Sequence, residues 1–355
     1  MATIDDVAAA AGVSKSTVSS VFSQKRPISK EVTERVLDAA RQLNYKPNYW
    51  ARSLASKTTR IIGLNMPGES VKFSLFHLSL LNGVLSECNA NGYRLLVNPL
   101  SGTYLNEVPH LSSEPVDGDI LLDPVENDSR IADRLRQSLP LVVVGRPPGD
   151  FESKVCYVDN DNVANGRQVT DYLLRLGHTR ILFLNASAGK TVSADRGLGY
   201  RRSLEEAGIP FDPQLLVHKD PAATTSAFGY SVAKSLLQRR PDVTAVIADT
   251  DKMALGVYKA AAELGIAIPD DLSVIAFSDE SVFAAEFVPP LTGVKLNSEE
   301  LGREAAKLLI ERCASGNPSV KRALIPTEMV ERGSCGPASP GAAGRRCERG
   351  GDALP

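Results

Sequence analysis

Apolar and polar positions over residues 1–46 follow the 3.6-residue period of three short helices. Thr3, Ser14 and Ser29 each precede one of these patterns and are residue types that favour helix N-caps. Gly12 interrupts the first pattern, where a tight turn requires a positive φ. The apolar stripe of the third helix consists of Val32, Val36, Leu37, Ala40 and Leu43. The pattern predicts a small all-α domain over residues 1–46.

From residue 61 onward, short apolar runs rich in β-branched residues alternate with helical patterns. The predicted strands are Ile61–Leu64, Arg94–Val97, Gly118–Leu122, Leu141–Val144, Arg180–Leu184, Thr244–Ala248 and Ser273–Phe277. The predicted helices are Leu78–Asn89, Gly166–Leu176, Gly197–Ala207, Gly229–Gln238 and Asp251–Leu264. This alternation is typical of parallel α/β sheets with crossover helices. Because residues 61–332 exceed what one sheet needs, we expect two lobes. Lobe 1 is predicted over about 61–160 and 291–320, and lobe 2 over about 161–290 and 321–332.

Two segments lack these periods. Residues 47–60 form a short basic connector, which reads NYWARSLASKTTR from residue 48. A hinge helix here would be too short to be stable without a partner. Residues 333–355 are rich in Gly, Pro and Ala and have no apolar period, which predicts a disordered tail.

Composition limits the function classes. A length of 355 residues predicts two or three domains, and 43% hydrophobic with 23% charged residues is an ordinary globular balance. No apolar run reaches the roughly 18 residues that a membrane-spanning helix requires. Two acids precede any apolar stretch at the N-terminus, which is unlike a secretory signal. We therefore expect a cytoplasmic protein without a membrane partner.

The five cysteines are widely spaced and form no CxxC pair. Free thiols in a reducing compartment fit this pattern best, and a disulfide framework or a zinc site is the less favoured alternative. The four histidines are also scattered and lack metal-ligand spacing. We expect no metal and no cofactor.

Charge is distributed unevenly along the chain. Residues 1–60 contain ten Lys/Arg and five Asp/Glu, whereas the remainder contains 30 and 37. A basic N-terminal domain on an acidic body indicates that only this domain meets a polyanion, although charged runs are often only solvated faces.

A helix-turn-helix signal lies in TIDDVAAAAGVSKSTVSSVF. Ala8 is small enough for a close helix crossing, Gly12 suits the turn, and Val18 is apolar where the second helix must dock. The second helix would expose Lys15, Ser16, Ser19 and Ser20 toward the major groove. The alternative is any small helical hairpin with a glycine turn.

The sequence resembles the LacI–GalR family of bacterial transcription regulators. The resemblance covers about residues 2–335. It is carried by TIDDVAAAAGVSKSTVS, RVLDAARQLNYKPN, ARSLASKTTRIIGL, LRLGHTRILFL, SADRGLGYRRSLEEAGI, DKMALGVYKAAAELGIAIPDDLSVIAF and PPLTGVKLNSEELGREAAKLL. It implies a homodimer on palindromic operator DNA. Each subunit would carry a helix-turn-helix headpiece, a hinge helix and a two-lobed core like periplasmic sugar-binding proteins.

The resemblance also assigns DNA-contacting residues. Its base-reading positions are Lys15, Ser16 and Ser20, and its phosphate-contacting positions are Ser14, Thr17 and Asn48. Many members carry Arg in place of Ser20, and Arg reads guanine through two hydrogen bonds that Ser cannot make. Leu54 occupies the position of a leucine wedge that opens a base step in the minor groove. The alternative for Leu54 is an ordinary apolar residue of a linker helix.

The resemblance places an effector between the lobes, at the carboxyl ends of parallel strands. Arg196 matches the family's effector-contacting arginine, whose fork could hold paired hydroxyls or a carboxylate. Phe76 and His77 match residues that line the cleft from lobe 1, and Thr250 and Asp251 match another cleft pair. The alternatives are a surface arginine, core packing for Phe76 and helix capping for Asp251.

Departures from the family pattern weaken any specific sugar assignment. Ser278, followed by Asp279, stands where many members have an Asp that accepts ligand hydroxyls. Thr224 stands where some members have an aromatic lid. We therefore expect a small polar effector, a sugar or its derivative.

The sequence does not favour a catalytic function. Gly189, Lys190 and Thr191 look like the end of a phosphate-binding loop, but Leu184 stands where its upstream glycine is required. The sequence thus predicts an effector-controlled repressor and not an enzyme. A periplasmic-type binding module, an enzyme on a similar core, and a regulator that activates or uses a protein co-regulator are the alternatives.

Overall fold

The computed structural model describes residues 2–23, 26–46, 58–67, 73–100, 116–277, 282–315 and 319–339. The chain divides into two compact units, Met1–Thr59 and Arg60–Pro355, which are described separately. None of the helices in the described part combines the length and hydropathy that a membrane crossing requires.

The first unit is a headpiece of three helices, α1 (Ile4–Ala11), α2 (Lys15–Ser23) and α3 (Lys30–Gln42). Thr3 and Asp6 form a capping box at the start of α1. Gly12 follows α1 with a φ of 62°, so the turn into α2 uses a backbone conformation that favours glycine. The three predicted helices are present.

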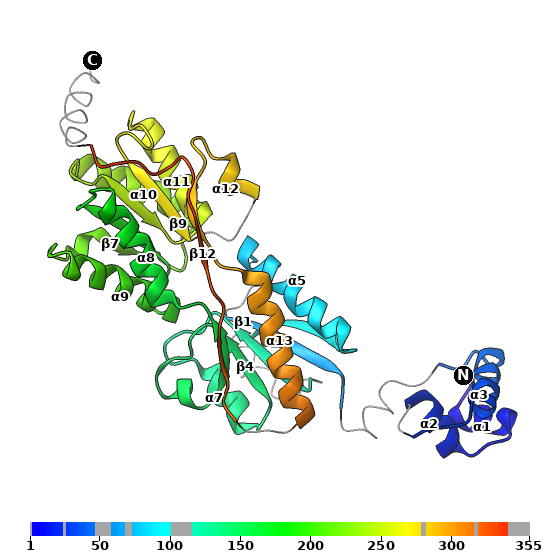
Figure 1. The fold of residues 1–355 in the computed structure, drawn as a ribbon. Coiled ribbons are helices and arrows are strands. Elements are labelled where there is room, and N and C mark those ends of the chain that lie inside the picture. Colours follow the sequence, from blue (N-terminus) through cyan, green and yellow to red (C-terminus); the bar gives the residue numbers. More distant parts are fainter. Residues whose placement is uncertain are drawn as a thin grey trace. The chain divides into compact units, whose positions relative to one another are not determined.

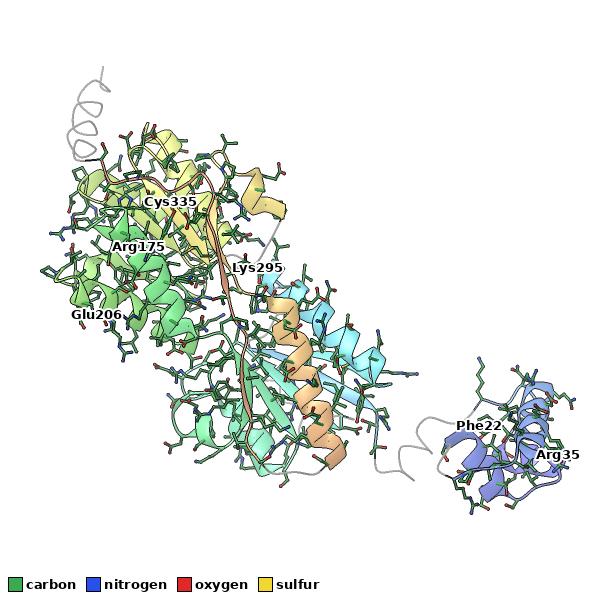
Figure 2. All side chains as sticks on the ribbon, in the orientation of Figure 1. Phe22, Arg35, Arg175, Glu206, Lys295 and Cys335 are labelled. Carbon is green, nitrogen blue, oxygen red and sulfur yellow. The ribbon has the colours of Figure 1, made fainter. Side chains whose placement is uncertain are left out.

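The headpiece core is small. Val7, Val18 and Val36 are completely buried, one from each helix. The rings of Phe22, labelled in Figure 2, and Tyr45 pack with centroids 5.9 Å apart. Leu37 and Leu43 from the predicted apolar stripe are more than one third exposed, because the stripe is wider than the area that α1 and α2 cover.

In the second unit, lobe 1 contains a parallel sheet in the order β11-β5-β4-β3-β1-β2 (Figure 1). Its strands are β1 (Ile61–Pro67), β2 (Arg94–Leu100), β3 (Gly118–Leu122), β4 (Leu141–Val144), β5 (Cys156–Asp159) and β11 (Arg322–Leu324). Helices α5 (Leu75–Ala90) and α13 (Ser298–Ser315) cover one face, and α7 (Ser129–Arg136) covers the other. A 3₁₀ turn, Gly149–Ser153, precedes β5.

Helices α5 and α13 pack closely through glycines. A Cβ atom on Gly83 would lie 1.9 Å from the carbonyl oxygen of Glu299, and one on Gly302 would lie 2.0 Å from that of Leu80. Only glycine therefore permits this backbone contact, which fixes α5 beside the sheet.

Lobe 2 contains a second sheet in the order β12-β10-β9-β8-β6-β7, in which only β12 is antiparallel to its neighbour. Its strands are β6 (Ile181–Asn185), β7 (Leu216–His218), β8 (Ala245–Ala248), β9 (Ser273–Phe277), β10 (Thr292–Lys295) and β12 (Glu328–Val330). A short 3₁₀ turn, Pro213–Leu215, leads into β7.

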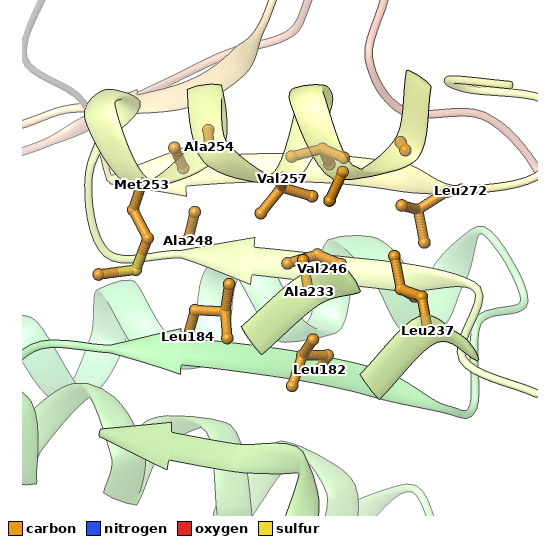
Figure 3. Close-up of a cluster of buried hydrophobic side chains, with 14 of the residues drawn as sticks. Leu182, Leu184, Ala233, Leu237, Val246, Ala248, Met253, Ala254, Val257 and Leu272 are labelled. Carbon is orange, nitrogen blue, oxygen red and sulfur yellow. The ribbon is translucent and has the colours of Figure 1, made fainter. Parts of the chain in front are cut away.

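Helices cover both faces of this sheet, so its central strands are apolar without alternation. Helices α10 (Thr225–Arg239) and α11 (Asp251–Glu263) bury the cluster shown in Figure 3, which includes Leu182, Val246 and Val257. Helices α8 (Asn162–Arg175) and α9 (Thr191–Glu206) pack on the opposite face. Helix α12 is Val282–Glu286.

The predicted lobe boundaries near the C-terminus are wrong in two places. Strand β10 pairs with β9, so residues 292–295 belong to lobe 2 and not to lobe 1. Strand β11 pairs with β5, so residues 322–324 belong to lobe 1 and not to lobe 2. Strands of three or four residues carry too little pattern to indicate which sheet edge they join.

The predicted tail also begins too early. Ser334 is completely buried, and its hydroxyl donates to the carbonyl of Val274 at 2.6 Å. The Ala338 amide donates to the carbonyl of Leu176, and the imidazole of His178 contacts the carbonyl of Gly336 at 3.0 Å. Residues 333–339 therefore pack along lobe 2, held by polar and backbone contacts that have no apolar period.

Candidate functional sites: the headpiece surface and the interlobe cleft

The start of α2 presents a row of short polar side chains. The Ser14 hydroxyl lies 2.8 Å from that of Ser16 and 2.9 Å from that of Thr17, and it accepts a hydrogen bond from the Thr17 amide. Lys15 is 62% exposed and pairs with Asp5 at 2.9 Å. Four of the predicted DNA-contacting residues thus lie together at one helix end, where side-chain hydroxyls suit phosphate oxygens.

Ser20 is not on the exposed face as predicted. It is only 9% exposed, and its hydroxyl donates to the carbonyl of Ser16 at 2.8 Å. The same hydroxyl accepts a hydrogen bond from Nε of Arg26 at 2.9 Å. The structure therefore places a guanidinium beside the position where many family members carry an arginine. Residue spacing did not indicate Arg26, because it lies beyond the end of α2.

Three predicted site residues, Asn48, Leu54 and Ser278, lie outside the described residues. The same holds for most of the predicted hinge, residues 47–60, of which only 58–60 are described. Their assigned roles remain predictions.

A cavity of about 210 Å³ lies between the lobes, at the carboxyl ends of the strands. It is lined by five of the predicted effector residues: Phe76, His77, Arg196, Thr250 and Asp251. Phe76 and His77 project from the first turn of α5, and Thr250 is the N-cap of α11. The cavity also includes Asp123, Asp159, Lys190, Asp249 and Phe277, which sequence reasoning did not select.

Arg196 is held on three sides in this cavity. Its Nε donates to Asn162 at 3.0 Å, its Nη1 donates to Asp249 at 2.8 Å, and its guanidinium lies 4.0 Å from the ring centroid of Phe277. The residue is only 5% exposed. Burial lowers the pKa of the guanidinium, while Asp249 opposes that shift. A fork fixed in this way is preorganised for a polar ligand.

An ion pair connects the two lobes across the cleft. Lys190, from lobe 2, places its ammonium 2.7 Å from the carboxylate of Asp123 in lobe 1. Nε2 of His77 lies 3.4 Å from the same carboxylate, and Nδ1 of His77 contacts Ser74, the N-cap of α5. Burial would raise the pKa of Asp123, but Lys190 and His77 hold that pKa far below its usual range.

A bidentate pair lies on the same side of the cleft. Nε and Nη2 of Arg146 in lobe 1 each donate to Asp195 in lobe 2 at 2.8 Å. Backbone contacts accompany it, because the Glu126 amide donates to the carbonyl of Gly189. These interlobe ion pairs, Arg146–Asp195 and Lys190–Asp123, join the two lobes.

The chain crosses between the lobes near Asn160, whose amide nitrogen donates to the carbonyls of Leu296 and Ile325. Next to it, burial raises the pKa of Asp159 to about 7, although hydrogen bonds from Asn160 and Asn162 oppose the shift. Asp161 caps α8 by accepting a hydrogen bond from the Ala164 amide. Among the described residues, no group of His, Cys, Asp and Glu is arranged to bind a metal ion.

Comparison with known proteins identifies both units. Residues 3–48 match the family described as bacterial regulatory proteins, lacI family, and residues 170–335 match the periplasmic binding protein-like domain. The HTH-type transcriptional regulator CelR of Thermobifida fusca is 32% identical over 94% of this chain and 98% of its own length. The HTH-type transcriptional repressor PurR of Vibrio atlanticus is 33% identical over the same shares.

Solved structures agree with this assignment. A structure titled as a transcriptional regulator CelR–cellobiose complex aligns with a TM-score of 0.73 and 30% identity, over 94% of this chain and 100% of that one. A lac repressor dimer bound to operator and the anti-inducer ONPF aligns with a TM-score of 0.80 at 24% identity, over 94% of this chain and 99% of that one, which supports the fold. The chain therefore belongs to the LacI family of bacterial transcriptional regulators.

Proposed function

We propose that this regulator is a repressor that binds a palindromic operator as a homodimer, and that a small polar effector in the interlobe cleft controls its affinity. The observation that carries the proposal is the Arg196 guanidinium, which its neighbours fix in a cavity lined by aromatic and carboxylate side chains. Such a mixture suits the apolar faces and hydroxyls of a sugar or its derivative. The relative whose complex contains cellobiose supports this ligand class.

Residues shared by the cleft and an outer groove support a coupling between effector binding and DNA binding. Leu75, Asp251 and Lys252 line the cleft and also line a groove on the outside of the core. A ligand that moves the first turns of α5 and α11 would therefore change the groove directly. We propose that this motion brings the two hinge segments of a dimer together or apart, with a coupling free energy of about 1–3 kcal/mol. The protein would act in the cytoplasm, where bacterial DNA lies.

The outer groove supports the homodimer. Its apolar lining residues are Leu75, Leu255, Tyr258, Phe283, Phe287 and Val288, and its charged lining residues are Asp251, Lys252 and Glu286. Leu255, Phe283 and Val288 are 53%, 57% and 89% exposed. Leu78 of α5 is also exposed, and α5, α11 and α12 lie on the same side of the core in Figure 1. Apolar side chains exposed together mark an interface.

We expect Leu255→Glu to produce monomers, because it would bury a charge in the proposed interface. Sedimentation velocity measures the change, and operator affinity should fall with it because two headpieces no longer act together. Gln168→Glu, which adds the same charge at an exposed position of α8 on the other face of the sheet, is the matched control. A Leu255→Glu protein that remains dimeric would contradict this interface.

Lys15→Ala should relax base preference at one step of each half-site. A good side-chain contact to a base edge contributes about 1–3 kcal/mol of discrimination. Selection of bound DNA from a random pool, before and after the substitution, measures the change. Arg35→Ala, which removes an exposed cation from α3, is the control and should leave the selected sequence unchanged.

The whole proposal is tested by two measurements on the purified protein. Selection from a random DNA pool should recover an inverted repeat, and a thermal-shift screen of sugars, sugar derivatives and nucleobases should recover a ligand that changes the affinity for that repeat. A monomeric protein without preference for any inverted repeat would overturn the proposal. So would a screen in which none of these compounds binds.

A further inference from the structure

We propose that the cleft takes an uncharged effector, and that Asp123 is the residue that excludes anionic ligands such as sugar phosphates. This inference rests on the proposed function and adds the charge class of its ligand. It begins from the motif Gly189-Lys190-Thr191, whose lysine faces the cleft although the motif lacks the upstream glycine of a phosphate-binding loop.

Lys190, which is partly buried, and Arg196, which is buried, each already have a carboxylate partner. The Lys190 ammonium lies 2.7 Å from Asp123, and the Arg196 guanidinium lies 2.8 Å from Asp249. A phosphate or carboxylate ligand would have to compete with these aspartates, whereas a hydroxyl can bind beside them. The pairs therefore remove the positive charge that an anionic ligand requires.

Carboxylates outnumber cations among the described residues that line the cleft. The lining includes Asp123, Asp249 and Asp251, and also Asp159, which is only partly ionised near neutral pH because its pKa is about 7, together with Lys190, Arg196 and Lys252. Lys252 is exposed to solvent and does not compensate the deeper carboxylates. An anion inside the cleft would therefore meet net negative charge in a site of low dielectric, where repulsion is strong.

At three helix N-termini near the cleft, one backbone amide is bound within the protein. Asp161 accepts the Ala164 amide at the start of α8, and the Thr250 hydroxyl accepts the Met253 amide at the start of α11. The first amide of α9, from Thr191, donates to the carbonyl of Pro124, next to Asp123. One amide at each of these three N-termini is thus bound within the protein and is not available to a phosphate.

Asp123 stands at the centre of this arrangement. Its carboxylate contacts Lys190 from the other lobe and lies 3.4 Å from Nε2 of His77. A neutral amide at this position would remove the carboxylate that lies 2.7 Å from the lysine, beside the imidazole of His77 and the N-terminal end of α9. Asp123→Asn should therefore convert this corner into an anion site while it preserves the shape of the side chain.

The experiment uses full-length protein and isothermal titration with inorganic phosphate and with glucose 6-phosphate. We expect neither compound to bind the wild type measurably. Asp123→Asn should bind them with an affinity roughly tenfold or more above the detection limit. The double variant Asp123→Asn/Lys190→Gln should lose the gain, because it removes the freed cation. Circular dichroism checks that each variant is folded.

Two results would overturn the inference. One is a wild-type protein that binds phosphate or glucose 6-phosphate. The other is a folded Asp123→Asn protein that shows no gain for either compound. Both arms use defined anions and need no knowledge of the natural effector, so they decide the charge class separately from the sugar and nucleobase screen that tests the proposed function.

Discussion

Arg196→Met is expected to reduce effector affinity by at least about 100-fold, because it removes a charged hydrogen-bond donor from a buried polar site. Operator binding by the variant should then no longer respond to the effector. The prediction follows from the geometry, since Arg196 is fixed by Asn162, Asp249 and Phe277 and has its guanidinium in the cavity. Titration calorimetry with the effector found by screening measures the loss.

A loss of folding must be separated from a loss of recognition. Arg196→Met leaves Asp249 without its partner in a mostly buried position, which costs about 3–5 kcal/mol in comparable ion pairs. The double variant Arg196→Met/Asp249→Leu removes both charges and should recover much of that stability in chemical unfolding. It should still fail to bind the effector. Wild-type effector affinity in either variant would contradict the role given to Arg196.

The headpiece was largely predictable because its signals are local. Capping by Thr3 and the turn at Gly12 each depend on residues within a few positions, and the burial of Val18 follows from the helical period of the same short segment. The exposed face of α2 was predicted less well, since the position of Ser20 depends on Arg26. That contact crosses a segment with no helical period, so no pattern indicates it.

The cleft was predicted through two general features. Parallel strands place their carboxyl ends at one edge, and the family resemblance selected residues such as Phe76 and Arg196 that do meet there. Asp123 and Lys190 were missed because their partnership spans 67 positions and two lobes. A sequence shows that charged residues exist, but it does not show which of them face each other across a cleft.

The C-terminal errors have a related cause. Strand β11 has an exposed, intermediate and exposed residue in succession, so it lacks the apolar run that marked the central strands. It joins lobe 1 only because β5 offers an open edge. Residues 333–339 similarly use the edge and surface of lobe 2 after that lobe has formed. Such segments are defined by tertiary contacts and not by their own composition.

The interlobe ion pairs give the cleft a property beyond ligand contact. Arg146–Asp195 and Lys190–Asp123 connect the lobes through the protein's own side chains. A ligand that binds near Lys190 can strengthen or weaken that connection. Because Leu75 and Lys252 line both the cleft and the outer groove, the change reaches the proposed dimer surface within one layer of side chains.

Val18→Asp is expected to abolish specific operator binding while it leaves effector binding intact. Val18 is completely buried in a headpiece core made of only a few small side chains. An aspartate there would be buried without a partner, and a domain of this size has only a few kcal/mol of stability to lose. Specific affinity should then fall by roughly 10³-fold or more, to the level of nonspecific binding or below.

The control is Leu37→Asp, which introduces the same side chain at a headpiece position that is 38% exposed. It should keep the amide NMR spectrum of a folded headpiece, whereas Val18→Asp should lose those dispersed signals. The second unit, Arg60–Pro355, should melt at the same temperature in both variants, because its hydrophobic core is separate from that of the headpiece. A Val18→Asp protein that retains a folded headpiece and full operator affinity would show that the buried face of α2 does not position the DNA-contacting residues.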